Sequence, residues 1–164
     1  MSKIISIDYG TKRVGVAISD SSRKIAFALE TISNKLIISY LQELLAKEEI
    51  STIVVGSPKN LNDKDNDISN EVQSFINTLN QKFSHLNIEK YDERFTSVIA
   101  KKIILSSGIN KKKRRNKSLV DKVSSTIILQ DYLQSLNEIL DFRYFPVNDF
   151  FSKIIFSGSP EKIT

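Results

Sequence analysis

Two acidic residues stand where side chains of neighbouring strands can meet. Asp8 comes near the end of the apolar stretch IISIDYG, residues 4 to 10, and Glu93 follows directly on NIEKYD. If these strands lie near each other in a sheet, the carboxylates converge at the carboxyl ends, where ligands bind in open α/β sheets. Paired carboxylates repel unless a cation joins them, and magnesium prefers oxygen ligands. A metal site is one hypothesis for this pair.

A third acid, Asp121, is expected on a long helix over residues 118–136. At helical spacing it lies on the same stripe as Ile128 and Tyr132, so it need not face solvent. Ser118 is the expected cap of this helix, which would put Asp121 in the first turn, where the helix dipole favours negative charge. The alternative is that Asp121 serves only the helix terminus.

The other acids have structural alternatives too. Asp8 could bond nearby turn amides, contribute to a phosphate-binding turn or face solvent at the edge of the strand. Glu93 could pair with Arg94 or Lys90 at the surface. The residue pattern alone leaves these interpretations open.

Composition excludes several other chemistries. The chain has no cysteine, one histidine and no GxSxG stretch, which removes disulfides, thiolate metal sites and the usual serine hydrolase arrangement. His85 is expected at a helix end, in a structural or exposed position. If this protein is an enzyme, carboxylates must carry the chemistry.

The length and charge indicate one globular domain with a basic loop. The 164 residues are 40% hydrophobic and 26% charged. Six of the 24 lysines and arginines lie in KKKRRNK, residues 111–117, which leaves 18 against 19 acidic residues elsewhere. No stretch is apolar enough for a membrane span and no signal-peptide pattern begins the chain, so we expect a cytoplasmic protein without membrane contact.

The elements that must position the acids follow from hydrophobic periodicity. Strands are expected over residues 3–9, 14–19, 26–31, 52–56 and 87–91, and helices over 36–47, around 72–83, from 96 or 97 to about 106, and over 118–136. The first three strands predict an antiparallel meander. The order βββαβαβαα predicts a mixed sheet with helices, hence an α/β fold.

We expect two regions in the chain. Residues 1–136 should form the folded domain, and residues 137–164 an aromatic-rich extension. The extension is expected to pack on the same domain, and an oligomer contact is the alternative.

Four stretches together resemble one family. IDYGTKRVGVAISD, TIVVGSPKNLN, YDERFTS and LVDKVSSTIILQDYL are similar, in order and spacing, to the YqgF-type proteins, the pre-16S ribosomal RNA processing nucleases also described as Holliday-junction-resolvase-like. The resemblance covers about residues 3–135 and implies a ribonuclease H-like fold, with a mixed five-stranded sheet flanked by helices. Where the family commonly has DERLT, this chain has Phe95 in place of the leucine. The small residues that are common after VDK are here Ser124 and Ser125. Neither difference affects an acid.

The resemblance implies a metal-dependent endonuclease that processes the 5′ end of pre-16S ribosomal RNA in ribosome biogenesis, with Mg²⁺ or Mn²⁺ as cofactor. It implies that Asp8, Glu93 and Asp121 are the catalytic, metal-binding carboxylates. It also implies that Lys12, Arg13 and Arg94 flank the nucleic-acid site. From its charge, the basic run is expected to add phosphate contacts through Lys112, Lys113, Arg114 and Arg115, and a solvated loop is the alternative. Partners would be the ribosomal RNA precursor, with ribosomal particles, or branched DNA.

Three alternatives remain at this point. The protein could resolve four-way DNA junctions, which would favour a dimer, or bind RNA as an assembly factor without catalysis. The IDYGT turn also resembles the phosphate-binding hairpin of actin-like ATPases, in which Gly10 and Thr11 would approach a nucleotide. That fold needs a second domain with a second glycine-rich loop, and this chain shows neither.

Overall fold

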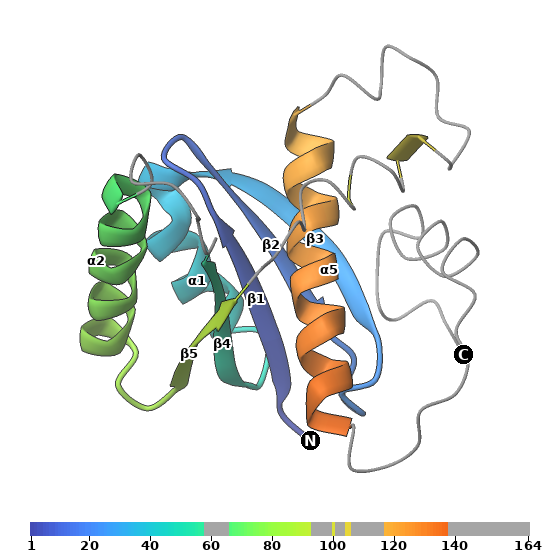
Figure 1. Ribbon diagram of the computed structural model, residues 1–164. Helices are drawn as coiled ribbons and strands as arrows, with labels where there is room; N and C mark the ends of the chain where they lie inside the picture. The colour runs from blue at the N-terminus through green and yellow to red at the C-terminus, as the bar shows by residue number, and fades with distance from the viewer. Residues whose placement is uncertain (58–65, 93–99, 101–103, 106–116, 138–164) are drawn as a thin grey trace.

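A single mixed sheet organises the protein (Figure 1). The computed structural model describes residues 1–57, 66–92, 100, 104–105 and 117–137. Its strands are β1 (Lys3–Tyr9), β2 (Arg13–Ser19), β3 (Ala26–Ser33), β4 (Ile50–Ser57) and β5 (Asn87–Asp92). Its helices are the 3₁₀ turn η1 (Asn34–Leu36), α1 (Ile37–Leu45), α2 (Asn66–Lys82) and α5 (Lys117–Asn137).

The strand order is β3-β2-β1-β4-β5, with β1 at the centre. The first three strands pair antiparallel, and β4 and β5 are parallel to β1. Strands β1, β4 and β5 therefore end at the same edge of the sheet. This confirms the predicted meander and the predicted α/β class.

Helices cover both faces of the sheet (Figure 1). Helices α1 and α2 pack on one face over a large apolar cluster that includes Ile5, Ile7 and Ile53, all fully buried. Burying each such side chain contributes roughly 1.5–3 kcal/mol, so this face supplies most of the core. Helix α5 packs on the other face over a smaller cluster built around Val54, Ile128 and Leu129.

Small and polar residues let α5 lie close to the sheet. Ser6 Oγ donates to the carbonyl of Ser125 over 2.6 Å, and the backbone amide of Ala26 donates to Gln130 Oε1 over 3.0 Å. Thr31 Oγ1 donates to the carbonyl of Ser118 over 2.8 Å. These bonds set the position of α5 on the meander.

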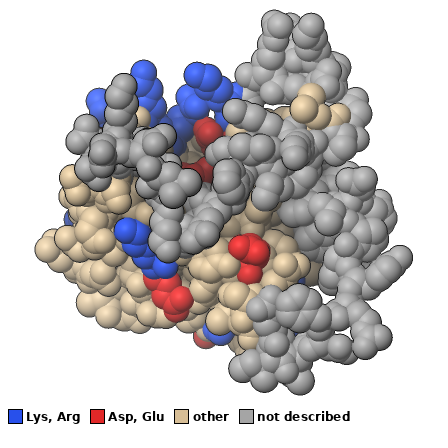
Figure 2. Space-filling view, viewed as in Figure 1, with Lys and Arg blue, Asp and Glu red and all other residues tan. Residues whose placement is uncertain are grey.

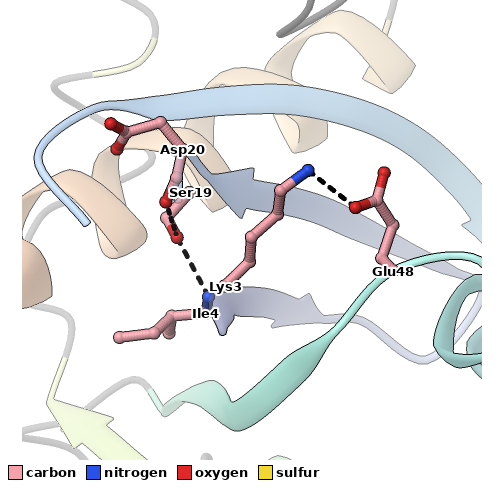
Figure 3. A network of polar contacts seen from close by, with 5 residues as sticks. All are labelled: Lys3, Ile4, Ser19, Asp20 and Glu48. Carbon is pink, nitrogen blue, oxygen red and sulfur yellow. Dashed lines mark hydrogen bonds and ion pairs between the residues drawn. The ribbon is translucent and has the colours of Figure 1, made fainter. Parts of the chain in front are cut away.

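The opposite edge of the sheet, where β1 begins, is closed by its own polar contacts (Figure 3). The amide of Ile4 donates to Ser19 Oγ over 2.9 Å, and that hydroxyl donates to the carbonyl of Asp20 over 2.8 Å. Lys3 Nζ pairs with Glu48 over 2.6 Å, which ties β1 to the segment between α1 and β4. This edge is structural.

The last helix begins earlier than its capping residue predicted. Helix α5 starts at Lys117, so Ser118 is helical, and the first turn of α5 contains no acid. The prediction that Asp121 lies in the first turn is therefore wrong. The helix dipole therefore stabilises Asp121 less than predicted, because the effect of the dipole falls off within one turn.

Two predictions lie outside the described residues, namely most of the helix expected to end near 106 and the extension over 138–164. Among the described helices, none combines the length and the apolar character needed to span a bilayer.

Candidate active site

Asp8 lies next to the carboxyl end of β1, between two glycines. Its backbone pairs with Gly15 on β2 and with Gly56 on β4. Directly paired residues of neighbouring strands point to the same face. Since Ser6, two residues earlier, bonds to α5, this row of residues also faces α5. Asp8 is thus an acid flanked in the sheet by residues without side chains.

Asp121 approaches the same row from α5. A Cβ built on Gly15 would lie 2.2 Å from the backbone oxygen of Asp121 and 3.2 Å from Ser125 Oγ. The helix backbone therefore rests on Gly15, and only glycine accommodates this contact. Gly15 pairs with Asp8 in the sheet, so the helix contact at Gly15 places the charge of Asp121 close enough to raise the pKa of Asp8.

Arg13 pairs with one of the two acids. Its Nε donates to Asp121 Oδ2 over 2.8 Å, and the two side chains are 40% and 24% exposed. Arg13 begins β2 two residues before Gly15, so by the alternation of strand residues its side chain also faces α5. The predicted nucleic-acid-binding residue thus contacts one of the predicted catalytic acids.

Asp8 has no such partner among the described residues, which supply neither a hydrogen-bond donor nor an ion pair to its carboxylate. Burial raises the pKa of Asp8 to about 7, and the negative charge of Asp121 adds to the rise. A nearby positive charge would lower this pKa and favour the ionised form of the carboxyl group, which is the form that binds a cation.

One more oxygen atom near this part of α5 lacks a partner. Ser124 is buried, and its hydroxyl finds no hydrogen-bond partner in the described part of the chain. It lies three residues after Asp121 on the helix. Buried polar groups without partners are uncommon and call for a water, an ion or a ligand.

The oxygen donors suit a hard divalent cation such as Mg²⁺ or Mn²⁺. Within the described ranges the arrangement is incomplete, since no three His, Cys, Asp or Glu side chains gather there. Glu93, the third predicted acid, lies outside the described residues. Strand β5 ends at Asp92, paired with Ser57, at the same edge of the sheet as Asp8.

The turn between β1 and β2 supplies positive charge beside the acids. Lys12 is exposed in this turn, and its carbonyl accepts the backbone amide of Asn34 over 3.1 Å. Asn34 Nδ2 donates to the carbonyl of Gly10 over 2.7 Å, so the first residue of η1, directly after β3, holds the turn in place. Figure 2 shows acidic side chains recessed between lysine and arginine side chains along this edge.

The remaining predicted binding residues, Arg94, Lys112, Lys113, Arg114 and Arg115, also lie outside the described residues. His85 is exposed between α2 and β5, as predicted. Sequence reasoning missed the pairing of Arg13 with Asp121 and the contact at Gly15. The signal for the latter was a glycine inside an otherwise β-branched strand, which often marks a close backbone approach.

A solved structure shares this architecture. The fold is similar to that described as "T. thermophilus RuvC in complex with Holliday junction substrate", with a TM-score of 0.53 and 13% identity, over 84% of this chain and 97% of that one. At this identity the likeness concerns the fold alone. It confirms the predicted ribonuclease H-like sheet.

Curated relatives are much closer in sequence. A protein of Bacteroides thetaiotaomicron, named "Putative pre-16S rRNA nuclease", is 42% identical over 135 residues, which are 82% of this chain and 98% of the relative. A protein of Flavobacterium johnsoniae with the same name is 40% identical over 135 residues, with the same coverage. Residues 2–135 also match the family described as "RuvX: Holliday junction resolvase". The chain therefore belongs to the RuvX family.

Proposed function

We propose that this protein is a metal-dependent endonuclease that hydrolyses phosphodiester bonds, and that it processes the 5′ end of pre-16S ribosomal RNA. The observation that carries the proposal is the Asp8 carboxylate, raised in pKa beside Asp121 and without a partner among the described residues. Relatives about 40% identical carry the name "Putative pre-16S rRNA nuclease", which supports a nuclease acting on this RNA.

In this proposal, Asp8, Asp121 and Glu93 hold Mg²⁺ or Mn²⁺. Such ions activate the attacking water and stabilise the departing oxygen of a phosphodiester, so a histidine base is unnecessary. Asp8 must lose its proton to become a ligand, and binding therefore releases a proton at pH values below about 7.

The basic residues hold the nucleic-acid backbone. Lys12 is exposed in the turn that follows Asp8, and the basic run with Lys112, Lys113, Arg114 and Arg115 directly precedes α5 in the sequence. Arg94 directly follows the third acid in sequence. Contacts of this kind add affinity without selecting a base sequence, because phosphates are the same in every sequence.

A second candidate is the cleavage of four-way DNA junctions. It is favoured by the description of the matching family and by the fold shared with a junction-bound resolvase. The third is an RNA-binding assembly factor without catalysis. The acid pair argues against this third reading, because an uncompensated carboxylate is costly to maintain unless it has a use.

The test is cleavage of a labelled pre-16S RNA beside a four-way DNA junction, in Mg²⁺ and in Mn²⁺. We expect RNA cleavage that Asp8→Asn abolishes. The matched control is Asp131→Asn, the same change at an exposed acid of α5 that accepts a hydrogen bond from Tyr91, and it should cleave normally. Junction cleavage alone would transfer the assignment to DNA. RNA binding unchanged in EDTA, without cleavage in either ion, would support the assembly factor.

A further inference from the structure

Among the described residues, Arg13 is the cation in direct contact with the acid pair. Its backbone is fixed by the sheet, because it pairs with Ser33 on β3. A Cβ on Gly10 would lie 2.6 Å from the Arg13 carbonyl oxygen, so the turn also packs closely against it. The guanidinium therefore extends from a rigid base.

Asp121 depends on Arg13 for its orientation. The contact at Gly15 fixes the backbone of Asp121, but its carboxylate has no other hydrogen-bond partner in the described part of the chain. Without the guanidinium, the side chain would turn freely about its own bonds. Once Asp8 is ionised, its repulsion would then favour orientations in which the two acids point apart.

The contact leaves room for a cation. A single bond joins Arg13 Nε to Asp121 Oδ2, rather than the paired bonds of a bidentate arrangement. A carboxylate offers two oxygens with several lone pairs, so Oδ1 stays available as a ligand. Arg13 therefore does not have to leave Asp121 before a metal binds, as an arginine bonded to both carboxylate oxygens would.

We propose that Arg13 is a positioning residue for the metal site: it holds Asp121 by one oxygen and so prepares the other for the cation. This role rests on the proposed function and replaces simple phosphate binding as the main task of Arg13. Partners that orient a metal ligand in this way typically change affinity or activity by about 10–100-fold when removed.

The first measurement is made in EDTA and needs no metal. Thermal unfolding of Arg13→Gln, Asp121→Asn and the double variant gives the coupling between the two side chains. We expect the double variant to lose less stability than the single losses together. Additive losses would mean that the pair does not form, and would overturn the proposal.

The second measurement is calorimetric titration with Mn²⁺ in the absence of nucleic acid. We expect Arg13→Gln to bind Mn²⁺ at least about 10-fold more weakly, and Arg13→Lys, which keeps the charge without the planar fork, to recover only part of the loss. Lys82→Gln changes an exposed lysine at the end of α2; it removes the same charge and should bind normally.

Unchanged binding by Arg13→Gln would show that Arg13 does not position the ligand, and tighter binding would show that it competes with the ion. Either result would overturn its positioning role. Failure of the metal site itself gives a different result. In that case neither the wild type nor Asp8→Asn would release or absorb heat on titration with Mn²⁺. Both the proposed function and the positioning role of Arg13 would then be wrong. Coupling in EDTA would then report a structural ion pair only.

Discussion

At the scale of one residue, the buried carboxyl group of Asp8 opposes the stability of the fold. Burial and the charge of Asp121 raise its pKa from 3.8 to about 7. The folded, metal-free protein therefore keeps a proton on Asp8 over a pH range in which the unfolded chain has lost it. Folding becomes less favourable as the pH rises between these two values, and the loss is complete above the folded pKa.

We accordingly predict that Asp8→Asn stabilises the protein in EDTA. At pH 8 the variant should be more stable by on the order of 2 kcal/mol, because an amide has no charge to desolvate. Below about pH 4 the difference should disappear, since the carboxyl group is then protonated in both states. Urea unfolding between pH 4 and 8 measures this. A difference independent of pH would contradict the assigned pKa, and Mn²⁺ should stabilise the wild type alone.

The candidate acids were predictable from sequence because each breaks a local pattern. Asp8 interrupts an apolar strand, and Asp121 lies on the apolar stripe of a helix. The bond from Arg13 to Asp121 was not predictable, since it joins residues 108 positions apart. Such a contact depends on how α5 crosses the sheet, which periodicity does not report.

At the scale of elements, the position of α5 on β2 decides where Asp121 lies. The helix backbone meets the sheet at Gly15, where a Cβ would stand 2.2 Å from the Asp121 oxygen and 2.7 Å from its carbonyl carbon. These neighbours are backbone atoms, so relief requires a shift of the helix. The hydrogen bonds from Ser6 and Thr31 to α5 resist that shift.

Gly15→Ala should therefore reduce both stability and Mn²⁺ binding. We expect a loss of about 1–3 kcal/mol from overpacking, together with a displaced Asp121. Ala17→Gly is the matched control, because it removes a methyl group from the same face of β2 two residues on. It should lower the melting temperature yet bind Mn²⁺ as the wild type does, at a temperature where both variants are folded. Normal Mn²⁺ binding by Gly15→Ala would show that the helix position does not control the site.

The elements themselves were largely predictable from sequence. Runs of β-branched residues predicted β1, β2 and β4. Apolar residues spaced three and four positions apart predicted α1 and α5. The start of α5 was misplaced by one residue, because Ser118 resembles a cap while the helix already begins at Lys117. Boundaries depend on local hydrogen bonds that compete closely, so they are less predictable than the elements.

At the scale of the whole molecule, positive charge gathers at the edge that carries the acids. Lys12 and Lys35 are both exposed there, joined through the bonds of Asn34 to the β1–β2 turn. Lys117 is exposed at the start of α5, next to the carbonyl of Ser118 that Thr31 holds. These three lysines form a rim on the β3 side of the site, which the basic run in residues 111–117 continues along the chain.

The salt dependence of RNA binding tests how much of this charge is used. Each engaged cation should contribute about 0.7 to the slope of log affinity against log salt for a single strand. Changing Lys12, Lys35 and Lys117 to Gln should reduce the slope by up to about 2, and changing Lys112, Lys113, Arg114 and Arg115 by up to about 3, if all are engaged.

The matched control removes three charges elsewhere. Lys24, Lys47 and Lys82 are exposed on other parts of the chain, and their change to Gln alters net charge as much as the change of the rim does. Because counterion release is local, this control should leave the slope unchanged, whereas a general attraction would weaken binding equally in both triple variants. Equal slopes for the rim variant and the wild type would place the RNA elsewhere. A reduced slope would assign the phosphates to the edge at which Asp8 and Asp121 meet.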